Sequence, residues 1–191
     1  YARSVSVSLP SLLLVDGRPR RAALAALAGA VEAHPATSAF PVVIARAGGL
    51  PAAAARASSR GPVLVGWSVS SADLPAAGAL ARRLRERAGT APLVLVAGGP
   101  HASADPEATL RAGFDLAAEG EGERTIVDLL ARMARGDDPR GSGLAWMVDG
   151  RLRRGPAPPP VDLDEVPPFA PGLGLFGPVE LSRGCGHACR Y

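Results

Sequence analysis

The residues of this sequence best suited to chemistry are its only two cysteines, Cys185 and Cys189. Three residues separate them, in the stretch Gly184-Cys185-Gly186-His187-Ala188-Cys189. Closely spaced thiolates allow one loop to wrap an iron–sulfur cluster. Two thiolates do not complete such a ligand set, but the spacing matches the first two positions of Cys-x3-Cys-x2-Cys. We therefore predict that Cys185 and Cys189 ligate a metal, with the third cysteine expected directly after Tyr191.

Three other interpretations of the two cysteines stay open: free thiols, a local disulfide, or half of a zinc site. A disulfide across so short a loop is awkward, and zinc sites more often use two-residue gaps with a second pair or with histidines. His187 lies between the cysteines and could also ligate a metal. A loop histidine in such a position is more often a solvated side chain.

The composition describes a chain built on small apolar residues. Hydrophobic residues make up 47% of it and aromatic residues only 4%, so we expect a core of Ala, Val and Leu. All 21 basic residues are arginines, and with 18 acidic residues the net charge is +3. Because this excess is small and the arginines are spread among acids, the charge does not indicate a nucleic-acid partner.

The sequence gives little indication of a membrane-spanning helix or a signal peptide. No apolar run approaches the roughly 20 residues of a membrane-spanning helix, so no membrane partner is expected. The apolar stretch 9–15 is short and no small-residue cleavage site follows it, which argues against a signal peptide. Two cysteines form no disulfide framework, and this fits a reducing, cytoplasmic location. Because the sequence opens on Tyr1 and not on Met, we expect a trimmed or disordered N-terminus.

Short apolar runs alternate with longer stretches rich in Ala, Leu and Arg. The first strand is either Ser4–Leu9 or Leu12–Val15. Further strands are predicted at Pro41–Arg46, Pro62–Val69, Pro92–Ala97 and Asp115–Ala118, and helices at Arg20–Glu32, Pro51–Ser58, Pro75–Ala88, Asp105–Ala112 and Glu123–Arg135. Near-continuous apolar strands that alternate with helices indicate a parallel sheet covered on both faces. We therefore predict a doubly wound, Rossmann- or flavodoxin-like α/β domain over residues 1–140.

The second part of the chain has a different pattern. Residues 144–148 and 151–153, joined by Asp149-Gly150, predict a β-hairpin. The stretch 155–171 is rich in proline and predicts a semi-rigid linker. Hairpin and linker together form a predicted connection over residues 141–175. Val179–Leu181 predicts a new strand, which would open a further domain over residues 176–191.

Three predicted strands are followed by loops that could bind a ligand, at residues 66–71, 98–103 and 119–123. In an open α/β sheet, ligands bind at the carboxyl ends of the strands. Glycines there let a flat cofactor approach the backbone, and small hydroxyls can bond its periphery. Tight turns of any α/β domain also need such glycines. The candidate cofactor-binding residues are Ser68, Ser70, Gly98, Gly99, Pro100, His101, Glu119, Gly120 and Glu121.

The order of the motifs closely resembles the cobalamin-binding domain that precedes the barrel in class B radical S-adenosylmethionine enzymes. The matching runs are Gly98-Gly99-Pro100-His101, Ala104-Asp105-Pro106-Glu107, Gly113-Phe114-Asp115 and Glu119-Gly120-Glu121-Gly122-Glu123. The hairpin and the motif Asp162–Pro167 resemble the connection to the barrel, and Arg183-Gly184-Cys185-x3-Cys189 resembles the cluster loop. The resemblance covers about residues 60–191, whereas residues 1–60 match only in architecture.

This resemblance implies a cofactor and a partner. Cobalamin would lie at the carboxyl edge of the sheet, where Gly98 and Gly99 admit the corrin or its nucleotide tail and Ser68 and Ser70 donate hydrogen bonds. In the full-length protein, a 4Fe–4S cluster would cleave S-adenosylmethionine to a 5′-deoxyadenosyl radical within the chain's own C-terminal radical SAM barrel. Methyl transfer is the favoured reaction, with rearrangement or ring chemistry as alternatives. This fragment, one residue short of the third cysteine, is expected to be inactive alone.

One departure from the family concerns the lower cobalt ligand. Many such domains carry Asp-x-His-x-x-Gly after the first strand, but here the loop is Asp16-Gly17-Arg18-Pro19. His34 precedes a proline and is a poor substitute. His101 is placed beside the cofactor by the resemblance, but a hydrogen bond to the Asp105 turn explains it equally well. The resemblance therefore implies cobalamin bound without histidine, or a domain that has lost cobalamin.

Two rival functions use the same fold. The first is a cofactor-free structural or substrate-presenting module. The second is a flavodoxin-like binder of a nucleotide or flavin, which is weakened because no Gly-x-Gly-x-x-Gly loop follows the first strand.

Overall fold

A seven-stranded sheet with the order β2-β1-β3-β4-β5-β6-β7 forms the centre of the molecule. The computed structural model describes residues 9–17, 21–88 and 92–184. The five parallel strands are β2 (Val42–Ala45), β1 (Ser11–Val15), β3 (Val63–Ser68), β4 (Leu93–Gly98) and β5 (Leu116–Ala118). The order 2-1-3-4-5 confirms the predicted doubly wound, flavodoxin-like topology, with its switch point between β1 and β3.

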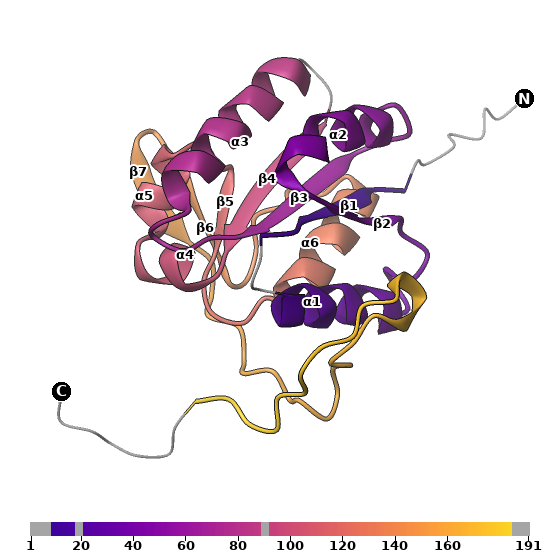
Figure 1. Ribbon diagram of the computed structural model, residues 1–191. Coiled ribbons are helices and arrows are strands. Elements are labelled where there is room, and N and C mark those ends of the chain that lie inside the picture. The colour runs from indigo at the N-terminus through magenta and orange to yellow at the C-terminus, as the bar shows by residue number, and fades with distance from the viewer. Residues whose placement is uncertain (1–8, 18–20, 89–91, 185–191) are drawn as a thin grey trace, which may run out of the picture.

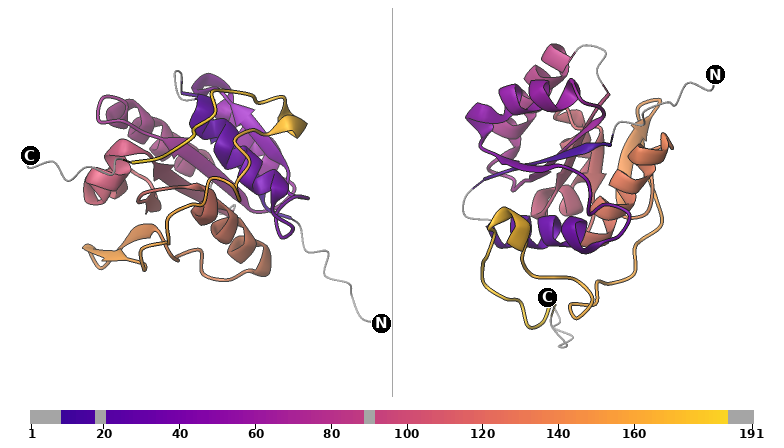
Figure 2. Two further views of the ribbon diagram at one scale, coloured as in Figure 1. Left: turned by 90° about the horizontal axis from the view of Figure 1, so that it is seen from below. Right: turned by 90° about the vertical axis from the view of Figure 1, so that its right-hand side faces the viewer.

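Helices cover both faces of this sheet (Figures 1 and 2). One face carries α1 (Arg21–Ala33) and α6 (Glu123–Arg135), and the other carries α2 (Leu50–Ser58) and α3 (Leu74–Ala88). The short helices α4 (Pro100–Ala104) and α5 (Pro106–Arg111) follow β4. Short 3-10 turns occupy Ala47–Gly49 and Pro171–Leu173.

The first strand shows why helices must cover both faces. All five residues of β1 are buried. Leu12 and Leu14 pack into the core beneath α1 and α6, whereas Leu13 and Val15 pack into the core beneath α2 and α3. Because successive side chains of a strand point to opposite faces, an unbroken apolar run must be covered twice. The alternative first strand at Ser4–Leu9 falls mostly on residues outside the described part of the chain.

The predicted hairpin is confirmed, and it belongs to the same sheet. Its strands are β6 (Leu144–Val148) and β7 (Arg151–Arg154). The turn residues Asp149 and Gly150 have φ angles of 49° and 72°, the left-handed conformation that a two-residue hairpin turn needs. β6 pairs antiparallel with β5, so the hairpin extends the sheet. The predicted division at residues 140 and 175 stays a prediction.

Two local predictions were wrong. The stretch after Gly99 was expected to be a loop, but Pro100 opens helix α4, because proline suits the first turn of a helix and Gly99 adopts a φ of 93° before it. Val179–Leu181 forms no strand, since no strand lies beside it in the described chain to supply a ladder. The predicted cap of α5 is confirmed, because Asp105 accepts a 2.9 Å hydrogen bond from the Ala108 amide.

The proline-rich linker packs along α1 instead of extending away from the domain. Ala170 is completely buried within the core beneath α1 and α6. The contact is close at Gly29, where an added Cβ would lie 2.2 Å from the carbonyl oxygen of Phe169. The absence of a side chain at Gly29 therefore allows the linker backbone to pack directly against α1.

We predict that Gly29→Ala lowers the free energy of unfolding by about 1–3 kcal/mol, the usual cost of a methyl group forced into filled space. Helix propensity alone would favour alanine by about 1 kcal/mol. Urea unfolding measures the net effect, and limited proteolysis measures release of the linker. Gly48→Ala is the matched control, since a Cβ there meets nothing within 4 Å. Equal stability and equal linker cleavage in both variants would contradict the packing of the linker against Gly29.

Candidate functional site

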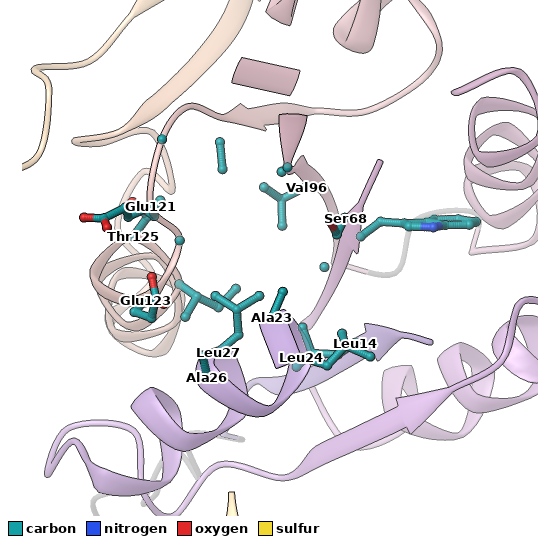
Figure 3. A pocket seen from close by; sticks show the side chains of 18 of the residues that line it. Leu14, Ala23, Leu24, Ala26, Leu27, Ser68, Val96, Glu121, Glu123 and Thr125 are labelled. Atoms are coloured by element: carbon teal, nitrogen blue, oxygen red, sulfur yellow. Dashed lines mark hydrogen bonds between the residues drawn. The ribbon is translucent and has the colours of Figure 1, made fainter. Parts of the chain in front are cut away.

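A pocket of about 320 Å³ opens between α1, α6 and the carboxyl ends of β3, β4 and β5 (Figure 3). Leu14 and Val96 contribute to its sheet side, and Leu24 and Leu27 come from α1. Thr125 lies on the α6 side. This volume lies within the range of small-molecule sites in proteins, and the lining is largely apolar. The position is the expected one for a ligand of a doubly wound sheet.

Glycines keep the strand ends of this pocket open. Gly98 ends β4, and a Cβ built on it would make only an ordinary 3.6 Å contact with Ala118. Gly99 is more constrained: its φ is 93°, and an added Cβ would fall 2.7 Å from the Ser68 Oγ. Gly120, with a φ of 79°, faces open space. A flat ligand could therefore approach the backbone at Gly98 and Gly120, whereas the Ser68 side chain fills the space beside Gly99.

The structure brings about half of the predicted site residues into this pocket. The predicted residues that line it are Ser68, Gly98, Gly99, Gly120 and Glu121. Those that do not are Ser70, Pro100, His101 and Glu119. The Ser70 hydroxyl donates to Asp73 at 2.6 Å, and Glu119 accepts a 3.0 Å hydrogen bond from Arg154 of the hairpin. A role for this second group in cofactor binding stays a prediction.

His101 has a defined environment in α4. Its Nδ1 lies 2.9 Å from the Ser71 hydroxyl, so the side chain bonds to the loop after β3 and not to the Asp105 turn. Its Nε2 is buried and has no hydrogen-bonding partner among the described residues. Neither ring nitrogen is presented to the pocket between α1 and α6.

Sequence reasoning missed the apolar wall that α1 and α6 supply. These residues are Ala22, Ala23, Leu24, Ala26 and Leu27 of α1, and Thr125, Ile126 and Leu129 of α6. An amphipathic stripe has the same spacing whether it covers a core or a ligand, so periodicity does not separate the two. One signal was available in Gly66, since an isolated glycine within a strand often marks close approach of a ligand or backbone.

The outer end of the pocket carries charge. The guanidinium of Arg183 contacts three carboxylates, at 3.1 Å from Glu121, 2.6 Å from Glu123 and 2.7 Å from Glu180. Glu123 is only 5% exposed and lies at the N-terminus of α6, where the helix dipole favours a negative charge. The pKa of Arg183 is raised, chiefly because the guanidinium donates to Glu123. Of the four residues in this cluster, only Glu121 was predicted as a cofactor-binding residue.

Glu121 also holds the linker. Its Oε2 accepts a 2.6 Å hydrogen bond from the Val161 amide, and this bond is the main cause of a pKa below the ordinary value of 4.5. Arg183 lowers the pKa further, while burial opposes the shift. The carboxylate of Glu121 is therefore stabilised in its charged form by two separate segments of the C-terminal part of the chain.

The predicted metal ligands Cys185 and Cys189 lie outside the described residues. Within the described part of the chain, no group of three or more His, Cys, Asp and Glu residues is placed to hold a metal ion. No helix of residues 9–17, 21–88 or 92–184 is both long and apolar enough to cross a membrane.

A doubly wound sheet with an apolar pocket at its carboxyl edge defines a small-molecule-binding α/β domain. Residues 21–130, more than half of the chain, match the model of the B12 binding domain, and the chain belongs to this family. The predicted relationship to cobalamin-binding domains is thus confirmed. The comparison with curated proteins finds no match.

Two solved structures share the fold. One is the cobalamin-dependent S-adenosylmethionine radical enzyme OxsB with aqua-cobalamin bound, at a TM-score of 0.68 and 18% sequence identity. The other is the selenomethionine-labelled apo form of OxsB, at a TM-score of 0.64 and 18% identity. Each alignment covers 88% of this chain and 25% of the OxsB chain. This chain therefore spans about a quarter of the length of OxsB.

We predict that acid weakens the fold through Glu121. Because the pKa of Glu121 is depressed in the folded state, its contribution is present above its ordinary value of 4.5 and is lost as the pH falls through the lower folded value. The free energy of unfolding should therefore fall more between about pH 6 and about pH 3 in the wild type than in Glu121→Gln. Urea unfolding at each pH measures this difference, and parallel pH profiles would contradict the assignment.

Proposed function

We propose that this domain binds cobalamin, with the nucleotide tail between α1 and α6 and the corrin over the carboxyl edge of the sheet. The observation that carries the proposal is the apolar pocket at the ends of β3, β4 and β5, in a chain that belongs to the B12 binding domain family. The lining fits an aromatic base, because Leu14, Leu24 and Val96 offer dispersion contacts and no competing charge.

The polar parts of the tail have a different set of partners. The Ser68 hydroxyl and the backbone at Gly98 and Gly99 would hold the ribose and phosphate side. The opposite end of the pocket carries Glu121, Glu123 and Glu180 against the single cation Arg183. Three carboxylates against one guanidinium disfavour a phosphate there, so the tail is oriented with its phosphate toward the glycines.

Cobalamin, when bound, supplies a cobalt centre that can carry a methyl group. The residues of this chain position that centre and exclude water. Packing of the tail between α1 and α6 would fix the corrin relative to the sheet, because two walls of the pocket are helices packed on that sheet. The seven-stranded sheet therefore acts as a holder for the cofactor.

The lower face of cobalt would have no histidine ligand. The loop after β1 reads Asp16-Gly17-Arg18-Pro19. His34 follows the C-terminal end of α1, at the opposite edge of the sheet from the pocket, and its Nδ1 accepts a hydrogen bond from the Ala36 amide. The side chain of His101 bonds to Ser71 and its Nε2 is buried. Neither of these two described histidines lines the pocket.

We further infer that the domain serves a radical SAM barrel of the same full-length protein, with methyl transfer as the favoured reaction. Support comes from the fold shared with OxsB, which is itself a cobalamin-dependent S-adenosylmethionine radical enzyme. In that setting Cys185 and Cys189 would ligate the 4Fe–4S cluster that binds S-adenosylmethionine, in the cytoplasm. A third cysteine directly after Tyr191 in the full gene would support this assignment, and another residue there would contradict it.

We predict that Gly98→Leu weakens hydroxocobalamin binding by at least about tenfold, because the new side chain would enter the tail pocket. Gly98 suits this test better than Gly99, since its φ is not in the left-handed region and leucine adds no backbone strain. Gly48→Leu, at an exposed and open site, is the control and should bind as the wild type does. Spectrophotometric titration measures all three affinities.

Cobinamide, which has the corrin but no nucleotide, separates the two parts of the proposal. It should bind the wild type at least about tenfold more weakly than hydroxocobalamin, and Gly98→Leu should not weaken it further. Equal binding of both corrinoids would place the tail elsewhere. No binding of hydroxocobalamin by the folded wild type would favour the cofactor-free module, and flavin binding would favour the flavodoxin-like alternative.

A separate prediction concerns the axial ligand. His34→Ala and His101→Ala should leave the visible spectrum of bound hydroxocobalamin unshifted, because neither residue bonds to cobalt. A lost cobalt–nitrogen bond would move the absorption bands. A shift in either variant, with the affinity retained, would identify that histidine as the lower ligand.

A further inference from the structure

The segment Gly177–Arg183 passes the N-terminal end of α1 (Figure 2). Gly177 packs on α1, where an added Cβ would lie 3.7 Å from the Cα of Ala22. Farther along, Glu180 and Arg183 join the lining of the pocket. The segment thus begins against one wall of the pocket and ends against the other.

Very few contacts hold this segment in place. Among the described residues, no backbone hydrogen bond ties positions 177–183 to the rest of the chain. Val179 and Leu181 are 54% and 92% exposed, so they contribute little apolar burial. The polar contacts to the domain converge on Arg183, which bonds Glu121 and Glu123.

The guanidinium of Arg183 is suited to this role. Its Nη1 donates to Glu121 and its Nη2 to Glu123, so one planar group spans two carboxylates at the start of α6. The side chain keeps only 27% of its exposed area and that of Glu123 only 6%, so water screens this pair less than it screens a surface ion pair. Its Nε donates to Glu180 of the same segment at 2.7 Å, which stiffens the segment locally.

We propose that Arg183 is a positioning residue that fixes Gly177–Arg183 as the outer wall of the pocket and thereby slows the release of bound cobalamin. This inference rests on the proposed function, because it assigns a role to the wall of the same site. Arg183 does not bind the cofactor phosphate, since three carboxylates already surround its guanidinium. Loss of Arg183 would free the wall and also leave Glu123 without its cation.

The test compares dissociation rates of hydroxocobalamin from the wild type, Arg183→Gln and Arg183→Lys. The loaded proteins are mixed with excess apo-transcobalamin as a trap, and release is followed by absorbance. Arg183→Gln should release cobalamin about tenfold faster, with an association rate within about twofold of the wild type, because loss of a partly buried charge contact acts on dissociation. The release rate of Arg183→Lys should lie between those of the wild type and Arg183→Gln, because one ammonium does not span both carboxylates as the guanidinium does.

Arg124→Gln is the matched control. Arg124 pairs with Glu165 of the linker at 3.0 Å but does not line the pocket, so its loss removes an arginine–linker contact without opening the wall. Its release rate should equal that of the wild type. The proposal is overturned if Arg183→Gln releases cobalamin at the wild-type rate, or if Arg124→Gln accelerates release equally. If the folded wild type does not bind cobalamin at all, the proposed function itself is wrong, and the role of Arg183 in retaining cobalamin is wrong with it.

Discussion

The fold depends on the need to bury both faces of the parallel strands. β1, β3 and β4 carry Leu and Val on both sides, so neither face can be left to solvent. Helices α1 and α6 satisfy this requirement on one face, but they cannot close over the carboxyl ends of the strands. At that edge the sheet offers Gly66, Gly98 and Gly99, which give the helices nothing to pack against. The pocket follows from core packing that stops short of the strand ends.

Electrostatics then sets the polarity of this pocket. The N-terminal turn of α6 and the loop before it place Glu121 and Glu123 at one end, where the helix dipole and Arg183 stabilise their charges. The other end consists of glycine backbone and the Ser68 hydroxyl. A ligand with an apolar ring and an anionic group can satisfy both ends in only one orientation. The B12 binding domain family points to such a ligand, and under the proposed function the charge distribution would orient it.

The sequence was sufficient for the parallel strands and for the helices other than α4, because apolar runs and their spacing depend on local burial. It also located the hairpin, since Asp149-Gly150 specifies its turn geometrically. It failed where the outcome depends on neighbours distant in the chain. Val179–Leu181 has the residues of a strand but no adjacent strand among the described residues, and the Gly-Pro sequence after β4 fits a loop as well as the helix that forms. The α1 wall of the pocket was invisible for the same reason, because only the position of α6 decides what α1 faces.

The linker connects these observations. It contacts α1 at Gly29, buries Ala170 in the core, and bonds Glu121 in the loop before α6 through the amide of Val161. Beyond the linker, Arg183 bonds Glu123 of α6. Each contact lies on the layer of helices that forms the pocket, and none lies on the face covered by α2 and α3. The C-terminal part of the described chain is therefore held against the pocket walls by a close backbone contact, a buried alanine and polar contacts that include those of Val161 and Arg183. Because Arg183 stands two positions before Cys185, these contacts hold the chain almost to Gly184, where the described residues end.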